Sequence, residues 1–445
     1  MQDPTYKIFL CDYINPQTEK KATLVRNGAI VLKKQNKPKN QCLYKIYEKG
    51  EEKSILPKYF NKQSVEVVQM TKLLALPAFF DMHFHWVQDG VCLRPKISLL
   101  NWLKKYTWPY EAKFKNIKFS NKKAYEFSKL LTKVGTLGGA CYSSIHSNAL
   151  EDAFKNFKGD FIIGNVIMTI NSPKYLSMTS RDTAALVRKM VAKYQGRYAL
   201  TPRFALSVDA PLMRELGDYI KNKKIFVQTH LSETKVEIKA VLDLYKAFIG
   251  FEKVKTYTEI YDKCHLIGPR SLFGHGIYLS SKELSLLKKK KAWIAHCPTS
   301  NAPIKDKGLG SGLFDFKKIE RAGVNWVLAS DVGGGPYLSM FDVIESYVSQ
   351  NNKKLITSAT YIKGLYHSTL KSAEFLGLKK THGNLDEGKY ANMIFVASPA
   401  AQDHEKVEEV LSKIISKNKS NRKQYNEMVY YTYYKGHEVY SSRSR

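Results

Sequence analysis

Two histidines separated by a single residue, His83 and His85, follow an apolar stretch of the chain. Side chains two positions apart on a β-strand point to the same side, so both imidazoles can face one metal ion. An H-x-H pair alone is a weak signal, because histidines also occur as ordinary packed residues. Whether this pair binds a metal therefore depends on the polar groups that the fold brings to it.

Further groups that can bind a metal or transfer a proton follow three later apolar stretches. They are His230, Glu233 three residues after it, His275 and Asp331. Imidazole nitrogens and carboxylates bind transition metals, and both also act as general acids and bases. These groups form a single site only if the ends of the apolar stretches converge.

Apolar stretches alternate with longer amphipathic ones from about residue 74 onward, which is typical of βα units and a parallel sheet. Amphipathic segments at residues 124–134 and 182–194 are long enough to form helices that cross back over such a sheet. We expect eight strands, at residues 76–83, 139–145, 161–168, 198–206, 225–230, 271–275, 292–297 and 325–330. This pattern predicts an α/β fold, a closed (β/α)8 TIM barrel.

A TIM barrel gathers its catalytic side chains at the C-terminal ends of its strands. The polar groups described above stand at the predicted ends of the first, fifth, sixth and eighth strands. Core packing does not readily explain such groups at four strand ends of one barrel. The sequence therefore predicts one shared active site.

Short β-rich runs fill both ends of the chain. They lie at residues 29–33, 44–47, 65–70, 391–396 and 428–434. We expect residues 1–73 and 388–445 to form one composite, small β-sandwich domain, and residues 74–387 to form the barrel domain. Hydrophobic residues make up 44% of the chain, which is ample for a large core.

The composition disfavours several classes of protein. The net charge is +31, but the basic residues are spread along the whole chain rather than clustered as in nucleic-acid-binding proteins. No apolar run approaches the roughly 20 residues of a membrane span, and the N-terminus lacks the layout of a signal peptide. The six cysteines form no C-x-x-C pair, which argues against a thiolate metal site. We therefore expect a cytoplasmic protein that binds neither nucleic acid nor membranes.

The set of strand-end residues resembles the amidohydrolase superfamily, with its strand-one H-x-H, strand-five and strand-six histidines and strand-eight aspartate. Within it, the chain is most similar to the guanine deaminases. The motifs that carry this similarity lie at residues 83–88, 102–109, 201–204, 229–233 and 295–301. The P-R-F and W-L-x-K-Y-T-x-P motifs discriminate best between these enzymes and their relatives. The zinc deaminases of the cytidine type are excluded, because neither H-x-E nor P-C-x-x-C occurs.

The resemblance implies a mononuclear zinc site. Its ligands would be His83, His85, His230 and Asp331, with one position left for water. Relatives with two metals use a modified lysine at the end of the fourth strand, and residues 198–207 contain no lysine. Bound zinc lowers the pKa of water from about 15.7 toward 7 and so provides a nucleophile.

The resemblance also implies the roles of the remaining groups. Glu233 would shuttle protons, Asp331 would accept the proton of the water, and His275 would polarise the nucleophile or contact the substrate. Substrate binding is expected at Gln88, Arg203, Phe204 and His275, with Phe204 or Trp86 stacking on the ring. Four further residues are candidates for orienting the ligands: His296, His146, Asp209 and Asp81.

The function that the resemblance implies is hydrolysis of guanine to xanthine and ammonia, in purine catabolism or salvage, by a homodimer. The strongest alternative is another aminohydrolase of the same superfamily, acting on a triazine, a pyrimidine, an 8-oxopurine or an adenosine derivative. A remote alternative is a non-catalytic scaffold with a hydrolase-like fold. An assay of ammonia release from a panel of purines and pyrimidines distinguishes these alternative functions.

Overall fold

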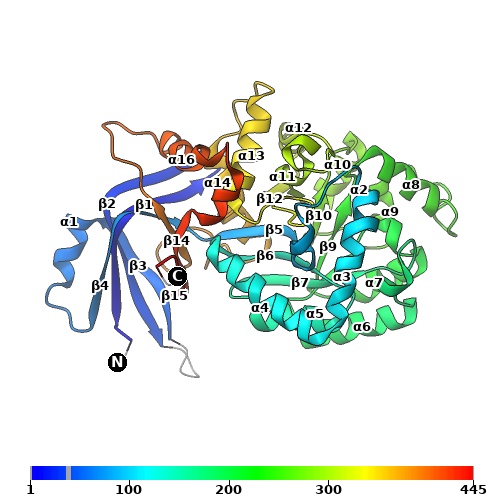
Figure 1. Cartoon of the computed structure of the whole chain (residues 1–445), viewed down its shortest axis with the longest axis horizontal. Coiled ribbons are helices and arrows are strands. Elements are labelled where there is room, and N and C mark those ends of the chain that lie inside the picture. Colours follow the sequence, from blue (N-terminus) through cyan, green and yellow to red (C-terminus); the bar gives the residue numbers. More distant parts are fainter. Residues whose placement is uncertain (1–2, 37–41, 444–445) are drawn as a thin grey trace. The chain divides into compact units, whose positions relative to one another are not determined.

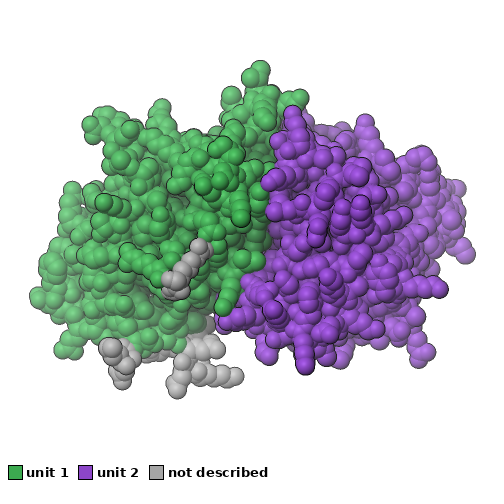
Figure 2. All heavy atoms as spheres, in the orientation of Figure 1, with its two compact units in different colours: residues 1–80, 129–138, 337–445 green, residues 81–128, 139–336 purple. Residues whose placement is uncertain are grey.

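The computed structural model describes residues 3–36 and 42–443, which form two compact units (Figure 2). One unit contains residues 1–80, 129–138 and 337–445, and the other contains residues 81–128 and 139–336. The domains expected from the sequence, 1–73 with 388–445 and 74–387, have different boundaries and stay a prediction. Of their residues, 1–2, 37–41 and 444–445 lie outside the described part of the chain.

Eight strands form one sheet in which each strand neighbours the next along the chain (Figure 1). They are β5 (Phe79–His85), β6 (Thr136–Ser143), β7 (Asp160–Ile167), β8 (Ala199–Pro202), β9 (Phe226–Leu231), β10 (Ser271–His275), β11 (Trp293–His296) and β12 (Asn325–Leu328). Adjacent strands from β7 to β12 run parallel. Most of these strands are buried along their full length, as expected for a parallel sheet covered on both faces.

The sheet closes on itself because the chain after β12 hydrogen-bonds to β5. The N–H of Asp331 donates to the His83 carbonyl at 2.8 Å, and the N–H of His85 donates to the Val332 carbonyl at 2.9 Å. The predicted (β/α)8 barrel is thereby confirmed.

Helices follow the strands of the barrel (Figure 1). They are α2 (Leu99–Trp102), α3 (Trp108–Glu111), α4 (Ile117–Lys133), α5 (Ser147–Asn156), α6 (Ser180–Lys193), α7 (Ala210–Ile220), α8 (Lys235–Tyr245), α9 (Tyr257–Lys263), α10 (Ser281–Lys289), α11 (Pro298–Asn301) and α12 (Phe316–Arg321). Helices α8, α9 and α10 each begin with a capping box, which satisfies amide groups that a helix start leaves unpaired. No helix among the described residues is both long and apolar enough to cross a lipid bilayer.

The two ends of the chain together build a second sheet of seven strands in the order β15-β14-β13-β4-β1-β2-β3. Its strands are β1 (Tyr6–Thr18), β2 (Lys21–Asn36), β3 (Cys42–Glu51), β4 (Val65–Pro77), β13 (Met393–Ala397), β14 (Val429–Tyr434) and β15 (His437–Ser441). The pair β1–β4 is parallel and the other pairs are antiparallel, so this is one mixed sheet. A core that includes Phe9, Ile30, Met393 and Phe395 joins the N-terminal strands to the C-terminal ones.

The same unit contains five further helices. They are α1 (Glu52–Ile55), α13 (Met340–Asn352), α14 (Tyr361–His367), α15 (Leu370–Phe375) and α16 (Val407–Ile415).

Several predicted barrel strands differ from the observed ones at their ends, and the second, expected at residues 139–145, spans Thr136–Ser143. Two of the differences have a clear cause. The first strand was expected to begin at residue 76, but Leu76 pairs with Ile394 in the seven-stranded sheet and the barrel strand begins at Phe79. Both strands are apolar and nearly contiguous, so periodicity cannot locate the change from one sheet to the other. The fourth was expected to reach residue 206, but it ends at Pro202 because the chain turns into a short 3₁₀ helix at Ala205–Ser207.

Candidate metal centre and active site

Four strand ends bring the predicted polar groups to one place. His83 and His85 end β5, His230 lies near the end of β9, His275 ends β10, and Asp331 follows β12 by three residues. All five side chains are buried or nearly so. Residues far apart in the sequence thus meet at the C-terminal end of the barrel, where TIM-barrel enzymes carry their active sites.

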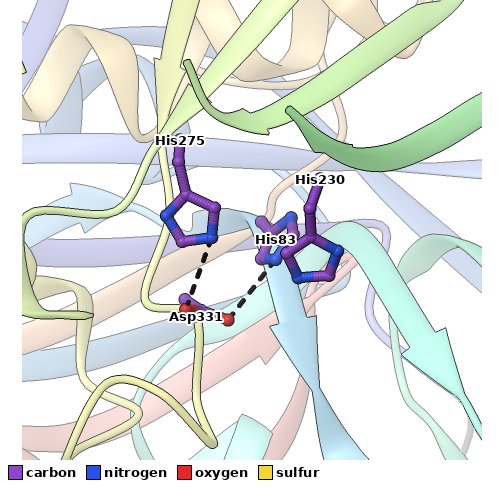
Figure 3. Close-up of side chains that lie close together, drawn as sticks. All are labelled: His83, His230, His275 and Asp331. Atoms are coloured by element: carbon purple, nitrogen blue, oxygen red, sulfur yellow. Dashed lines mark ion pairs between the residues drawn. The ribbon is translucent and has the colours of Figure 1, made fainter. Parts of the chain in front are cut away.

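The side chains converge closely enough for one ion to touch several of them. His83 Nε2 and His85 Nε2 lie 3.4 and 3.6 Å from the same oxygen, Oδ1 of Asp331. His85 Nε2 lies 3.3 Å from His230 Nε2. Figure 3 shows His83, His230, His275 and Asp331 pointing toward one another, and one ligand atom from each lies within 4.8 Å of the others.

Several of these buried nitrogens have no hydrogen-bond partner within the described residues. They include both ring nitrogens of His83, Nδ1 of His85 and Nε2 of His275. Buried polar atoms are rarely left without a partner, and each such atom calls for an explanation. Because one carboxylate and several imidazole nitrogens face a common centre, the residues fit a transition-metal ion.

Hydrogen bonds on the far side of two rings fix which nitrogen faces the centre. His230 Nδ1 donates to the carbonyl of Arg203 at 2.5 Å, and His275 Nδ1 donates to Oδ1 of Asn301 at 2.9 Å. Because these oxygens only accept, Nδ1 carries the proton and the Nε2 lone pair points to the centre. This arrangement is how proteins usually orient metal-binding histidines.

Burial disfavours the charged form of three of the histidines. It lowers the pKa of His83, and it lowers the pKa values of His85 and His230 well below the ordinary value. Burial alone would raise the pKa of Asp331, but His83, His275 and His85 outweigh it and lower that pKa well below its usual range. Neutral imidazoles beside an ionised carboxylate are the protonation states that metal binding requires.

Glu233 lies beside this cluster and is also buried. Its Oε1 accepts a hydrogen bond from Ser311 Oγ at 2.7 Å, and its Oε2 lies 3.6 Å from His275 Nε2. Burial raises the pKa of Glu233 above its ordinary value, which favours a carboxyl group that can hold a proton and release it again.

A cavity opens over the cluster, and the space within it and its open mouth is about 420 Å³. Gln88, Arg203 and Phe204 line it together with His85, His230, Glu233, His275 and Asp331. Its apolar wall consists of Leu99, Trp102, Leu103 and Leu309. The predicted substrate-binding groups therefore share one cavity with three of the predicted metal ligands, His85, His230 and Asp331.

Two residues of the site hold strained backbone conformations. His275 and Asp331 have φ values of 69° and 48°, in the left-handed region that side chains other than glycine seldom adopt. The tight approach of the strands also needs a glycine, because a Cβ on Gly274 would lie 2.6 Å from Cε1 of His83. Such strain persists only where the surrounding structure enforces it, and it is concentrated at functional sites.

A family model described as the amidohydrolase family matches residues 74–439. The chain belongs to the amidohydrolase family. A human protein described as guanine deaminase is 33% identical over 344 residues, which cover 74% of this chain and 73% of that protein. The resemblance inferred from the strand-end residues is thereby confirmed.

Solved structures of amidohydrolase-like proteins agree with the observed fold. One described as E. coli guanine deaminase has a TM-score of 0.84 at 24% identity, covering 98% of this chain and all of that one. Another, described as guanine deaminase from C. acetobutylicum with bound guanine in the active site, has a TM-score of 0.81 at 26% identity, again covering 98% of this chain and all of that one.

The amidohydrolase site contains three contacting groups that the sequence reasoning missed. Asn301 holds His275, Ser311 holds Glu233, and Glu111 binds both Gln88 and Arg203. Asn301 and Glu111 stand in or beside the motifs at 295–301 and 102–109, so proximity to those motifs was the available signal. Ser311 lies in a loop without any motif, and nothing in the sequence pointed to it.

The residues proposed to orient ligands have more varied surroundings in this amidohydrolase. Asp81 accepts the Ser330 N–H at 2.9 Å and the Ser330 hydroxyl, which supports the turn that carries Asp331. The ring of His296 stacks on Phe314, and His146 is the residue before α5. Trp86 packs edge-on against Phe114 and is not among the cavity-lining residues, which leaves Phe204 as the aromatic candidate for stacking.

Asp209 caps helix α7 in the structure, because its Oδ1 accepts the N–H of Leu212 at 2.9 Å. Its Oδ2 accepts hydroxyl hydrogen bonds from Thr169 at 2.8 Å and Ser180 at 2.9 Å. We therefore expect Asp209→Ala to lower the free energy of unfolding by about 1–2 kcal/mol through loss of the cap. Urea denaturation measures this change, and Asp209→Asn, which keeps a cap acceptor, should lose less. An Asp209→Ala protein that is fully stable but has lost bound metal would show instead that Asp209 orients a ligand.

Proposed function

We propose that this chain catalyses the hydrolytic deamination of guanine to xanthine and ammonia. The observation that carries the proposal is the shared cavity, in which the metal-binding cluster and Glu233 meet Gln88 and Arg203. The human relative and the guanine-bound C. acetobutylicum structure support guanine as the substrate. Structures described as an adenosine deaminase and a triazine hydrolase share the fold at only 17% and 13% identity, so they favour no other substrate.

The proposed cofactor is one zinc ion held by His83, His85, His230 and Asp331. Zinc would supply the Lewis acidity that makes water a nucleophile at neutral pH. A single ion is favoured because residues 198–207, around the end of the fourth strand, contain no lysine that could be modified to bridge two metals. His275 approaches both Glu233, at 3.6 Å, and Asp331, at 3.8 Å, which suits a group that holds the attacking water.

The chain's own carboxylates carry the protons of the reaction. Asp331, whose pKa is depressed by its histidine neighbours, is ionised and can accept the proton that water loses. Glu233, whose pKa is raised by burial, delivers a proton to the ring nitrogen beside C2. It is then reprotonated by a proton that originates from the water and delivers a second proton to the departing amine. Because the two protons of water replace the two that are delivered, both carboxylates return to their starting states. Water and guanine together supply every atom of xanthine and ammonia, so no other reactant is needed.

The substrate contacts are proposed at Gln88, Arg203 and Phe204. A planar guanidinium and a carboxamide can match the oxo group and ring nitrogens of a purine, and Phe204 offers an aromatic face to the ring. His275 contacts the substrate near the reacting carbon. We further propose a cytoplasmic homodimer that acts in purine catabolism or salvage, which size-exclusion chromatography and cell fractionation can test.

The metal proposal predicts about one zinc per chain in the purified protein. His230→Ala should lose both the metal and the activity, because it removes one of the proposed metal ligands. In the parent, the carbonyl of Arg203 holds this imidazole in its orientation. Elemental analysis measures the metal, and chelation of the parent should also lower its melting temperature, because metal binds the folded state. A ratio of two metals per chain would contradict the mononuclear site.

The mechanistic proposal predicts that Glu233→Gln keeps zinc and fold but loses turnover by about 10²–10⁴-fold, as expected for loss of a general acid–base group. The amide has nearly the same shape as the carboxylate but cannot relay protons. Steady-state ammonia release measures the effect, with elemental analysis as the control for metal. Turnover close to that of the parent would show that Glu233 is not the proton shuttle. His275 would then be the next candidate for that role.

The substrate proposal predicts that guanine is deaminated while adenine and cytosine are poor substrates. Arg203→Lys should reduce kcat/KM for guanine at unchanged zinc content, because an ammonium lacks the planar donor pair of a guanidinium. Ammonia release from a panel of purines, pyrimidines and triazines provides the measurement. The substrate assignment would be overturned if guanine were not deaminated while a triazine, pyrimidine, 8-oxopurine or adenosine derivative was. The proposed metal chemistry would remain in place.

A further inference from the structure

Glu111, at the end of helix α3, is a fully buried carboxylate that the proposed mechanism does not use. Its hydrogen bonds go to two of the residues proposed to contact the substrate. Gln88 Nε2 donates to Oε1 at 2.6 Å, and Arg203 Nη1 donates to Oε1 and Oε2 at 3.0 Å each. Glu111 therefore links two of the polar residues that line the cavity, Gln88 and Arg203.

The bond to Glu111 determines which end of the Gln88 amide is available to a substrate. An ionised carboxylate only accepts hydrogen bonds, so it must receive the NH₂ group of Gln88. The other end, Oε1, has no hydrogen-bond partner within the described residues and is left as an acceptor. Without Glu111, the amide could rotate and offer a donor instead.

The same carboxylate fixes the guanidinium of Arg203. Nη1 is engaged by both oxygens of Glu111, and this ion pair is buried, with side-chain exposures of 3% and 1%. Nη2 has no hydrogen-bond partner among the described residues and is left as a donor. Two residues that line the cavity thus keep a free acceptor, on Gln88, and a free donor, on Arg203.

We propose that Glu111 is a positioning residue that sets this acceptor–donor pair, so that the cavity selects purines with a lactam edge. Such an edge presents a ring N–H donor beside an oxo acceptor, which Gln88 Oε1 and Arg203 Nη2 match. Adenine presents the reverse pattern, a ring nitrogen acceptor beside an amino donor. Its acceptor would face the acceptor Gln88 Oε1, and its donor would face the donor Arg203 Nη2. The inference rests on the proposed function, because it places a purine in the cavity.

The test measures binding rather than turnover, with hypoxanthine and adenine as probes on the zinc-loaded full chain. Neither probe has an amino group at C2, so neither can undergo the proposed reaction. Isothermal titration of the parent should give tighter binding of hypoxanthine by about 100-fold or more, because the adenine edge opposes both groups. Glu111→Gln should reduce this preference at least tenfold, because its carboxamide lets the Gln88 amide rotate.

Two further variants separate positioning from packing. Glu111→Asp keeps a group that only accepts, so it should weaken both ligands and retain the preference for hypoxanthine. Glu283→Gln makes the same chemical change at another buried carboxylate, which accepts from Thr258 and Ser280 outside the cavity, and should leave the preference unchanged.

Equal weakening of both probes in Glu111→Gln would show a merely structural role and overturn the inference. If that variant does not fold, the parent and Glu111→Asp decide. If both the parent and Glu111→Asp bind hypoxanthine more tightly than adenine, the inference is supported. If either protein lacks this preference, the inference is overturned. Guanine turnover, assayed separately, reports on the proposed function, so a chain that prefers hypoxanthine but leaves guanine intact would contradict only that function.

Discussion

The hydrogen bond from the Asp331 N–H to the His83 carbonyl joins the chain after the last strand to the first strand. It closes the barrel, and it connects the backbones of two residues whose side chains approach within 3.4 Å. The site and the closure of the sheet therefore depend on the same contact. His230 and His275 join them through strand register, since Gly274 pairs with His230 and the next residue is His275.

Three buried carboxylates, two lining the cavity and one behind its lining residues, have different neighbours. Asp331 is surrounded by imidazoles that outweigh its burial and lower its pKa. Glu233 has a serine hydroxyl and one histidine beside it, so burial prevails and raises its pKa. Glu111 forms an ion pair with Arg203. Burial is common to all three, and the neighbouring groups determine the direction in which the pKa of Asp331 and that of Glu233 move.

The sequence predicted the strands and their polar ends well. The alternation of apolar and amphipathic stretches, and the position of polar residues after the apolar ones, can be seen locally along the chain. The join between β4 and β5 was misplaced because two apolar strands of different sheets are almost contiguous there. Contacts such as Glu111 with Arg203, 92 residues apart, depend on the closed barrel and have no local signal. Motifs shared with the amidohydrolase family located the cavity, but they did not reveal which buried groups hold its polar residues in place.

Arg203 serves the site through two chemically independent groups. Its main-chain carbonyl holds His230, and its guanidinium faces the cavity. Every amino acid has the same carbonyl, so the support of the histidine does not depend on which side chain occupies this position. Over evolutionary time, a barrel built in this way can exchange the side chain that faces its cavity while the backbone bond to the histidine is kept. Because the guanidinium is also ion-paired with the buried Glu111, such an exchange calls for a matching change at Glu111.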